Sequence, residues 1–162
     1  EDSVSLDRRA IRPLPPGRVQ VNASYLPDAD AMVMGAIELS WAHRDRLTQS
    51  SPVITDHTAA SIGPEPGVGY VIEIRWVDPE TGEDLSPAGI ILDAGPGTSW
   101  TLTPEDIPES SAPPRTAEID LAVRARRSLE GTWLTDREAR WFRLTAPFAA
   151  GWDRGWGVTW GG

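Results

Sequence analysis

The stretch AEIDLAVRARR, residues 117–127, has the most regular alternation of apolar and polar side chains in the sequence. One face of an extended chain would carry Ile119, Leu121, Val123 and Ala125, and the other face Asp120, Arg124 and Arg126. A period of two is typical of a β-strand with one face in a core and the other in solvent. The stretch therefore predicts a half-buried strand.

Six further segments carry similar strand signals, namely alternation or enrichment in β-branched and aromatic residues. They are residues 18–26, 36–43, 70–77, 88–94, 98–103 and 138–146. Pro79 and Gly82 predict a tight hairpin connection over residues 78–84. Thr103, as a cap for Pro104 and Asp106, predicts a single helical turn.

About seven short strands with turn signals between them, and no long amphipathic helix, predict an all-β fold, an antiparallel β-sandwich. Residues 135–140 leave a helical turn open as an alternative to the start of the last strand. The polar stretch 44–67 is too long for a hairpin. Loops of this length on a rigid scaffold are usually functional or disordered.

Three segments follow from this pattern: an extended linker over residues 1–17, the sandwich over 18–146, and a Trp/Gly-rich docking segment over 147–162. Prolines 13, 15 and 16 disfavour helix in the linker. A chain of 162 residues fits one domain. Because it begins at Glu1 rather than methionine, we expect a mature form or a piece of a longer polypeptide.

The net charge of −9 argues against nucleic-acid binding, which needs a positive surface. The chain contains no cysteine, which excludes disulfides, thiol catalysis and Cys-based metal sites. No apolar run approaches the roughly 20 residues that a membrane-spanning helix needs. The sequence predicts no bound cofactor.

No residues in the sequence indicate an enzyme. The chain has only two histidines, His43 and His57, and no nucleophile motif such as GxSxG. Asp28 and Asp30 make too few ligands for calcium and are assigned to a solvated turn. Glu65 also lies in a turn signal and is given no special role. We predict neither a catalytic nor a metal site.

Several residues are expected to have structural or binding roles. Trp41 is expected in the core. Arg44 and Arg46 would lie on the same side of a continuing strand and could clamp carboxylates of the 44–67 loop. Six arginines late in the chain could form a basic face, or be balanced by acidic neighbours: Arg124, Arg126, Arg127, Arg137, Arg140 and Arg143.

The order and spacing of the predicted strands resemble a fibronectin type III domain over roughly residues 17–146. Leu39-Ser40-Trp41 resembles the Leu-x-Trp of the second strand of that family, and Leu102-Thr103-Pro104 resembles the Leu-x-Pro before its sixth strand. The alternation from Ile119 to Ala125, followed by the turn 128–132, resembles its Tyr-x-Val-x-Val-x-Ala strand and glycine turn. Ile119 stands where that family has tyrosine, so a corner hydrogen bond is lost.

A narrower resemblance is to the C-terminal region of large tail-tip or baseplate proteins of tailed bacteriophages. It rests on residues 8–21, 38–49 and 62–76 and on the Trp/Gly-rich end. The resemblance implies a virion location, a structural role near host attachment, contacts with other tail proteins and sister chains, and assembly as a homotrimer. A host receptor or glycan is a further partner that it allows.

The chain ends in GWDRGWGVTWGG, residues 151–162. In an extended segment Trp152, Arg154, Trp156 and Trp160 share one face, because residues an even number apart point the same way. The opposite face is mostly glycine, which permits close approach of another backbone. We therefore predict a docking segment and assign partner binding to these four residues together with Arg44 and Arg46. The alternative is a carbohydrate-binding module with an aromatic platform.

Overall fold

In a computed structural model of the protein, the segments in which apolar and polar residues alternate form strands. The structure describes residues 12–25, 36–49, 55–86, 89–111, 117–136 and 140–144. The strands are β1 (Gly17–Val21), β2 (Ile37–Ala42), β3 (Val68–Val77), β4 (Ile90–Gly95), β5 (Ser99–Leu102), β6 (Glu118–Leu129), β7 (Thr132–Thr135) and β8 (Phe142–Leu144). Two short 3-10 turns, η2 (Pro104–Asp106) and η3 (Glu109–Ser111), follow β5.

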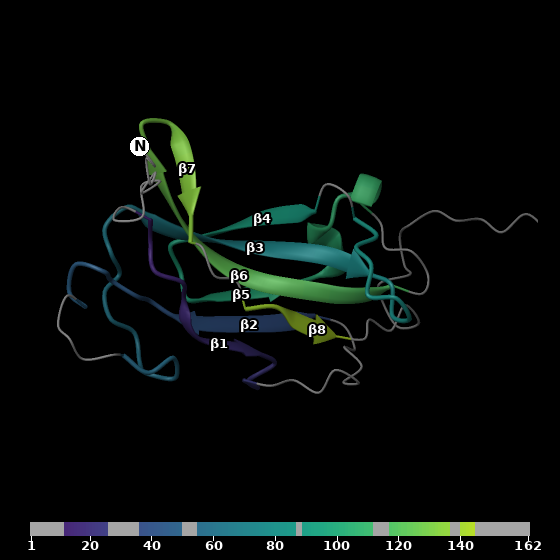
Figure 1. The fold of residues 1–162 in the computed structure, drawn as a ribbon, viewed down its shortest axis with the longest axis horizontal. Coiled ribbons are helices and arrows are strands. Elements are labelled where there is room, and N and C mark those ends of the chain that lie inside the picture. The colour runs from purple at the N-terminus through teal and green to yellow at the C-terminus, as the bar shows by residue number, and fades with distance from the viewer. Residues whose placement is uncertain are drawn as a thin grey trace, which may run out of the picture.

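The strands form two antiparallel sheets, which confirms the all-β, sandwich-like prediction. A three-stranded sheet has the order β1-β2-β5, and a five-stranded sheet has the order β4-β3-β6-β7 with β8 also paired to β6. Figure 1 shows β3, β4 and β6 above β1, β2 and β5. The connections from β2 to β3, from β4 to β5 and from β5 to β6 therefore cross between sheets.

The core lies between the two sheets and is built from one face of each strand. On β6 it takes Ile119, Leu121, Val123 and Ala125, the face expected from alternation. Ile37, Leu39 and Trp41 of β2 approach from the other sheet. Tyr70, Ile72, Ile74 and Trp76 of β3 complete the centre. Trp41 is buried as predicted and lies 5.3 Å, centroid to centroid, from the ring of Tyr70.

The last edge of the five-stranded sheet consists of two short strands rather than one. β7 pairs with residues 126–129 of β6, and β8 pairs with residues 119–121 of the same strand. β7 was not predicted, although the turn before it was. Because Thr135 lies in this strand, the alternative helical turn does not begin there.

Two segment boundaries differ from the prediction. Gly17, assigned to the linker, is the first residue of β1, and this strand ends at Val21 rather than at residue 26. A tight turn follows because Asn22 and Ala23 adopt positive φ angles of 48° and 62°. A backbone that turns left-handed leaves the extended strand path.

The predicted turns are present. Thr103 donates from its backbone N and from Oγ1 to Asp106 Oδ2, at 2.8 and 3.0 Å, at the start of η2. Asp78 accepts from the N–H groups of Glu80 and Thr81 and closes the turn after β3. The complete connection to β4 is longer than a tight hairpin, however, because β4 begins only at Ile90.

The connections gather at two ends of the sandwich, which we name by what they carry. The loop pole holds the long β2–β3 loop (residues 43–67), the β4–β5 turn and the β6–β7 turn. At the opposite end, the exit pole, Leu144 ends β8 beside Ile119. The N-terminal segment enters β1 at the loop pole, where Gly17 pairs with Ala42.

Candidate functional site

The long loop at the loop pole begins with a buried arginine. Arg44 is only 6% exposed, and its guanidinium lies among main-chain oxygens of the loop. Nη1 donates to the carbonyls of His43 and Ala60 at 2.8 and 3.1 Å, and Nη2 donates to those of Asp56, His57 and Ala59 at 3.1–3.4 Å. Arg44 therefore fixes the path of the loop backbone.

Two residues of β1, Gly17 and Arg18, lie next to Arg44 and the loop backbone that it binds. A Cβ at Gly17 would lie 1.9 Å from Arg44 Nη2, so only glycine leaves room for the guanidinium. The next residue, Arg18, has a positive φ of 50° at a bulge in the pairing with β2. This geometry lets the Arg18 N–H donate to His57 O at 2.5 Å, so the loop is attached to β1 as well.

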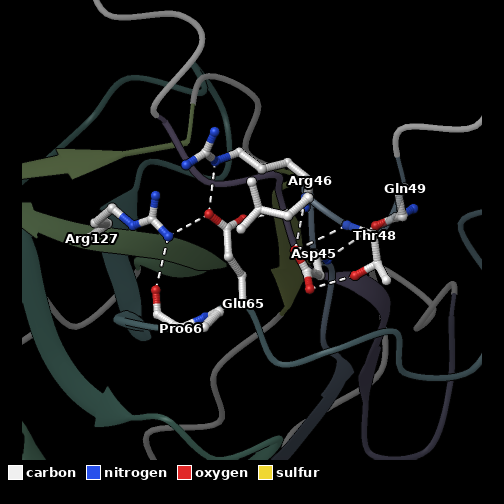
Figure 2. Close-up of polar contacts among 8 residues, drawn as sticks. Asp45, Arg46, Thr48, Gln49, Glu65, Pro66 and Arg127 are labelled. Atoms are coloured by element: carbon white, nitrogen blue, oxygen red, sulfur yellow. Dashed lines mark hydrogen bonds and ion pairs between the residues drawn. The ribbon is translucent and has the colours of Figure 1, made fainter.

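The loop ends with a buried carboxylate. Glu65 is 1% exposed and accepts from Arg46 Nε at 2.7 Å, from the Arg46 backbone N at 3.2 Å, and from Arg127 Nη2. Figure 2 shows the carboxylate between the two guanidinium groups. Arg127 also donates to Pro66 O at 2.8 Å. These contacts join the end of the loop to β6.

A local turn continues from Arg44. Asp45 accepts from the Leu47 N–H at 2.8 Å and from Thr48 Oγ1 at 2.5 Å (Figure 2). These bonds, the Thr48 hydroxyl first, lower the pKa of the Asp45 carboxyl. Gly63 has a φ of 104°, and a Cβ there would lie 2.9 Å from Asp45 Cβ. The two sides of the loop are therefore in close contact.

His43 connects the loop to the core. Its Nδ1 lies 3.0 Å from Tyr70 Oη, and the two rings lie 5.7 Å apart between centroids. Burial lowers the pKa of His43 and raises that of Tyr70 to about 12. Both groups are therefore uncharged near neutral pH, and the pair is a hydrogen bond between neutral side chains.

The late arginines do not form a free basic face where the structure describes them. Arg124 contacts Asp136 at 2.5 Å and Glu73 at 3.2 Å. Asp136, 1% exposed, also accepts from the Ala125 N–H. Carboxylates pair likewise with three others: Arg126 with Asp93, Arg127 with Glu65, and Arg143 with Asp120 and Glu118. Arg140 instead donates to the Tyr25 carbonyl at 2.7 Å and lies 5.0 Å from the ring centroid of Phe142. Acidic neighbours thus balance four of the five described arginines, as the alternative interpretation expected. Arg137 lies outside the described residues.

The predicted partner-binding residues divide into two groups. Arg44 and Arg46 both lie at the loop pole, but only Arg46 binds a carboxylate of the loop, since the partners of Arg44 are carbonyls. Trp152, Arg154, Trp156 and Trp160 lie outside the described residues, as do Asp28 and Asp30. The loop residues that the sequence predicted are thus brought together, and the tail prediction stays a prediction.

Two functional positions were missed. Glu65 was given no role, yet it is the most buried charged side chain of the loop. Its partner Arg127 lies 62 positions away, so no local pattern could reveal the pair. Gly17 carried only the signal of a linker glycine, because its need for space arises from Arg44.

Two comparisons with known proteins found no match. No protein-family model matches it, and no curated protein is significantly similar. Within the described ranges, no group of metal-ligating side chains comes together. Neither of the 3-10 turns found there is long and apolar enough to cross a membrane.

Proposed function

We propose that this chain is a structural and interaction module of a bacteriophage tail tip or baseplate, with a fibronectin-like sandwich that supports assembly and host attachment. Two antiparallel sheets joined by crossing connections are the architecture that such modules share with immunoglobulin domains. The strand order β1-β2-β5 and β4-β3-β6-β7 supports this assignment.

The observation that carries the proposal is the separation of the two poles. A loop held by Arg44 and Glu65 stands at one end, and the chain continues from the other end toward its Trp/Gly-rich segment. Loops positioned by a rigid scaffold commonly perform recognition. In this proposal the loop pole faces a partner or host, and the C-terminal segment docks on sister chains.

Oligomeric state tests the assembly half of the proposal. We expect the full chain to have the mass of a trimer by light scattering, and the triple variant Trp152→Ser, Trp156→Ser, Trp160→Ser to be a monomer. Trp133→Ser is the matched control, because Trp133 is 56% exposed on the sandwich itself. A triple variant that still forms trimers would contradict docking through the indoles.

A structure of the assembled tail tests the location. We expect the three C-terminal indoles to be buried against a neighbouring chain there. Ordered but solvent-exposed indoles would rule out the docking segment, and tail particles that lack the chain would rule out the virion role.

The alternative, a carbohydrate-binding module with an aromatic platform, has less support than the tail-tip proposal. A sugar platform needs two or three exposed, coplanar indoles, whereas Trp41 and Trp76 are buried and Trp100 packs against the core. Trp133 is exposed, but the Arg126 guanidinium lies 4.1 Å from its ring centroid and covers one face. Trp141 is half-buried, and the Arg75 guanidinium lies 4.2 Å from its ring centroid. Among the described tryptophans, therefore, none forms such a platform with another.

A further inference from the structure

A groove of about 300 Å³ lies on the three-stranded sheet at the loop pole. Its polar lining comes from β1, β2, the start of β5 and the long loop: Arg18, Gln20, Ser40, Ser61, Thr98 and Ser99. None of the described residues that line it carries a carboxylate. In a chain with a net charge of −9, a hydroxyl-rich groove whose one charged side chain is an arginine favours an anionic, hydroxylated ligand.

Arg18 differs in its pairing from the other arginines that lie within strands. Its Nε donates to Tyr25 Oη at 2.9 Å, and it has no ion-pair partner in the part of the chain that the structure describes. Carboxylates pair with the arginines elsewhere on the sheets: Arg75, Arg124, Arg126, Arg127 and Arg143. Within the described ranges, therefore, both terminal guanidinium nitrogens of Arg18 are available to a ligand at the groove.

The backbone conformation at position 18 gives no reason for the residue there to be an arginine. Arg18 sits at a bulge with a φ of 50°, a conformation that glycine adopts without strain and that other residues rarely adopt. Its backbone contact, the N–H to His57 O, would be available to any residue except proline. Strain that the surrounding structure holds in place often marks a functional side chain.

We propose that the groove binds an acidic saccharide residue, a sugar ring bearing a carboxylate. The planar guanidinium of Arg18 matches a carboxylate with two parallel hydrogen bonds. The side chains of Thr98 and Ser99 offer donors and acceptors to the ring hydroxyls. Ser61 Oγ accepts from the His43 N–H and keeps its own O–H as a donor, and Ser40 Oγ donates to Gln20 Oε1 and can still accept. The volume lies at the lower end of ligand sites and suits one sugar residue. The inference does not rest on the tail-tip proposal, because the isolated chain would bind the sugar whether or not it assembles.

The ligand class is tested by titrating the full chain with three probes: glucuronate, glucose as its neutral counterpart, and inorganic phosphate as an anion without a ring. We expect glucuronate to bind at least about tenfold more tightly than either of the others, because a charged hydrogen bond and the ring contacts both contribute. Equal binding of phosphate and glucuronate would overturn the saccharide assignment. Absence of saturable binding of glucuronate at millimolar concentration would overturn the site.

The role of Arg18 is tested by Arg18→Gly, which removes the guanidinium and relieves the positive φ. We expect the affinity for glucuronate to fall at least about tenfold, while the midpoint temperature of unfolding stays the same or rises. The matched control, Arg75→Ala, removes the same charge from the other sheet and should leave the affinity unchanged. Wild-type affinity in Arg18→Gly, a lowered midpoint in that variant, or an equal loss in Arg75→Ala would contradict the proposal.

Discussion

The two ends of the β2–β3 loop are fastened by opposite charges and in different ways. At its start, the cationic side chain of Arg44 binds neutral main-chain carbonyls, its hydrogen-bond partners among the described residues. At its end, the anionic side chain of Glu65 binds two cationic side chains, Arg46 and Arg127. One anchor contacts the backbone, and the other contacts particular residues.

The two anchors therefore have different structural roles. A guanidinium that binds carbonyls fixes the course of the main chain but is indifferent to the side chains of residues 56–60. A carboxylate that binds Arg127 fixes which strand the end of the loop lies against. We infer that the side chains around residue 57 can vary without loss of the loop path, whereas Glu65 and Arg127 must change together.

The largest effect is expected for Glu65→Ala. Removing one partner of a buried ion pair leaves uncompensated charge, and we expect unfolding free energy to fall by about 3–5 kcal/mol. Urea denaturation measures the change. Glu65→Gln, which retains one of the two acceptor oxygens, should lose less. A loss for Glu65→Ala below about 1 kcal/mol, the range of exposed pairs, would show that this anchor is not a buried one.

Arg44→Met should cost less, roughly 2–3 kcal/mol, because the loop carbonyls that it releases can bind water. The loss should also be local. Hydrogen exchange at the Arg18 amide, which donates to His57 O, should accelerate more than exchange at Ile72 in the core of β3. Equal acceleration at both amides would mean that Arg44 supports the whole sandwich rather than the loop.

Gly17→Ala should destabilise by about 1–3 kcal/mol, the usual range for overpacking, since the new Cβ would lie 2.1 Å from Arg44 Cζ. A double-mutant cycle sharpens the comparison of the two anchors. The cost of Gly17→Ala should shrink when Arg44 is methionine and stay the same when Glu65 is glutamine. Additivity with both partners would refute the steric explanation.

The smallest expected effect is a pH dependence from His43. Burial lowers its folded-state pKa below the value of 6.5 that it has when unfolded, so the unfolded chain binds more protons below that pH. Stability should therefore fall slightly as the pH drops from about 7.5 to about 5.5, and His43→Gln should remove this slope. The lowered pKa values of Asp45 and Asp56 act only at more acidic pH.

The matched control for this pH effect is His57→Gln, because the His57 side chain is 70% exposed. The slope should persist in this variant. If the slope instead survives in His43→Gln, another group is responsible.

The sequence predicted those features that depend on neighbouring residues. The alternation of β6 identified its buried face, and the spacing of Thr103, Pro104 and Asp106 identified η2. β7 was missed because its four residues, TWLT, are too short for a period of two to stand out. The position of Arg46 suggested a carboxylate partner, and Glu65 is that partner.

What could not be predicted depends on residues brought together by the fold. Glu65 lies in a segment with Pro64, Pro66 and Gly67 that is typical of an exposed turn, and only the position of β6 turns it into a buried anion. Asp136 is similar, since its burial requires Arg124 beside it. For Arg44, the charge pattern predicted carboxylate partners. The main-chain carbonyls that it binds come together only in the folded loop, and no charge pattern in the sequence indicates them.

The direction in which the chain enters and leaves the sandwich has a mechanical consequence. β1 starts at the loop pole, and β8 ends at the exit pole, so opposite pulls on the start of β1 and the end of β8 act along these strands. The bonds between β1 and β2, and between β8 and β6, would then be loaded together in shear instead of opening one after another. A domain connected in this way resists tension along its long axis, which suits a part that transmits force.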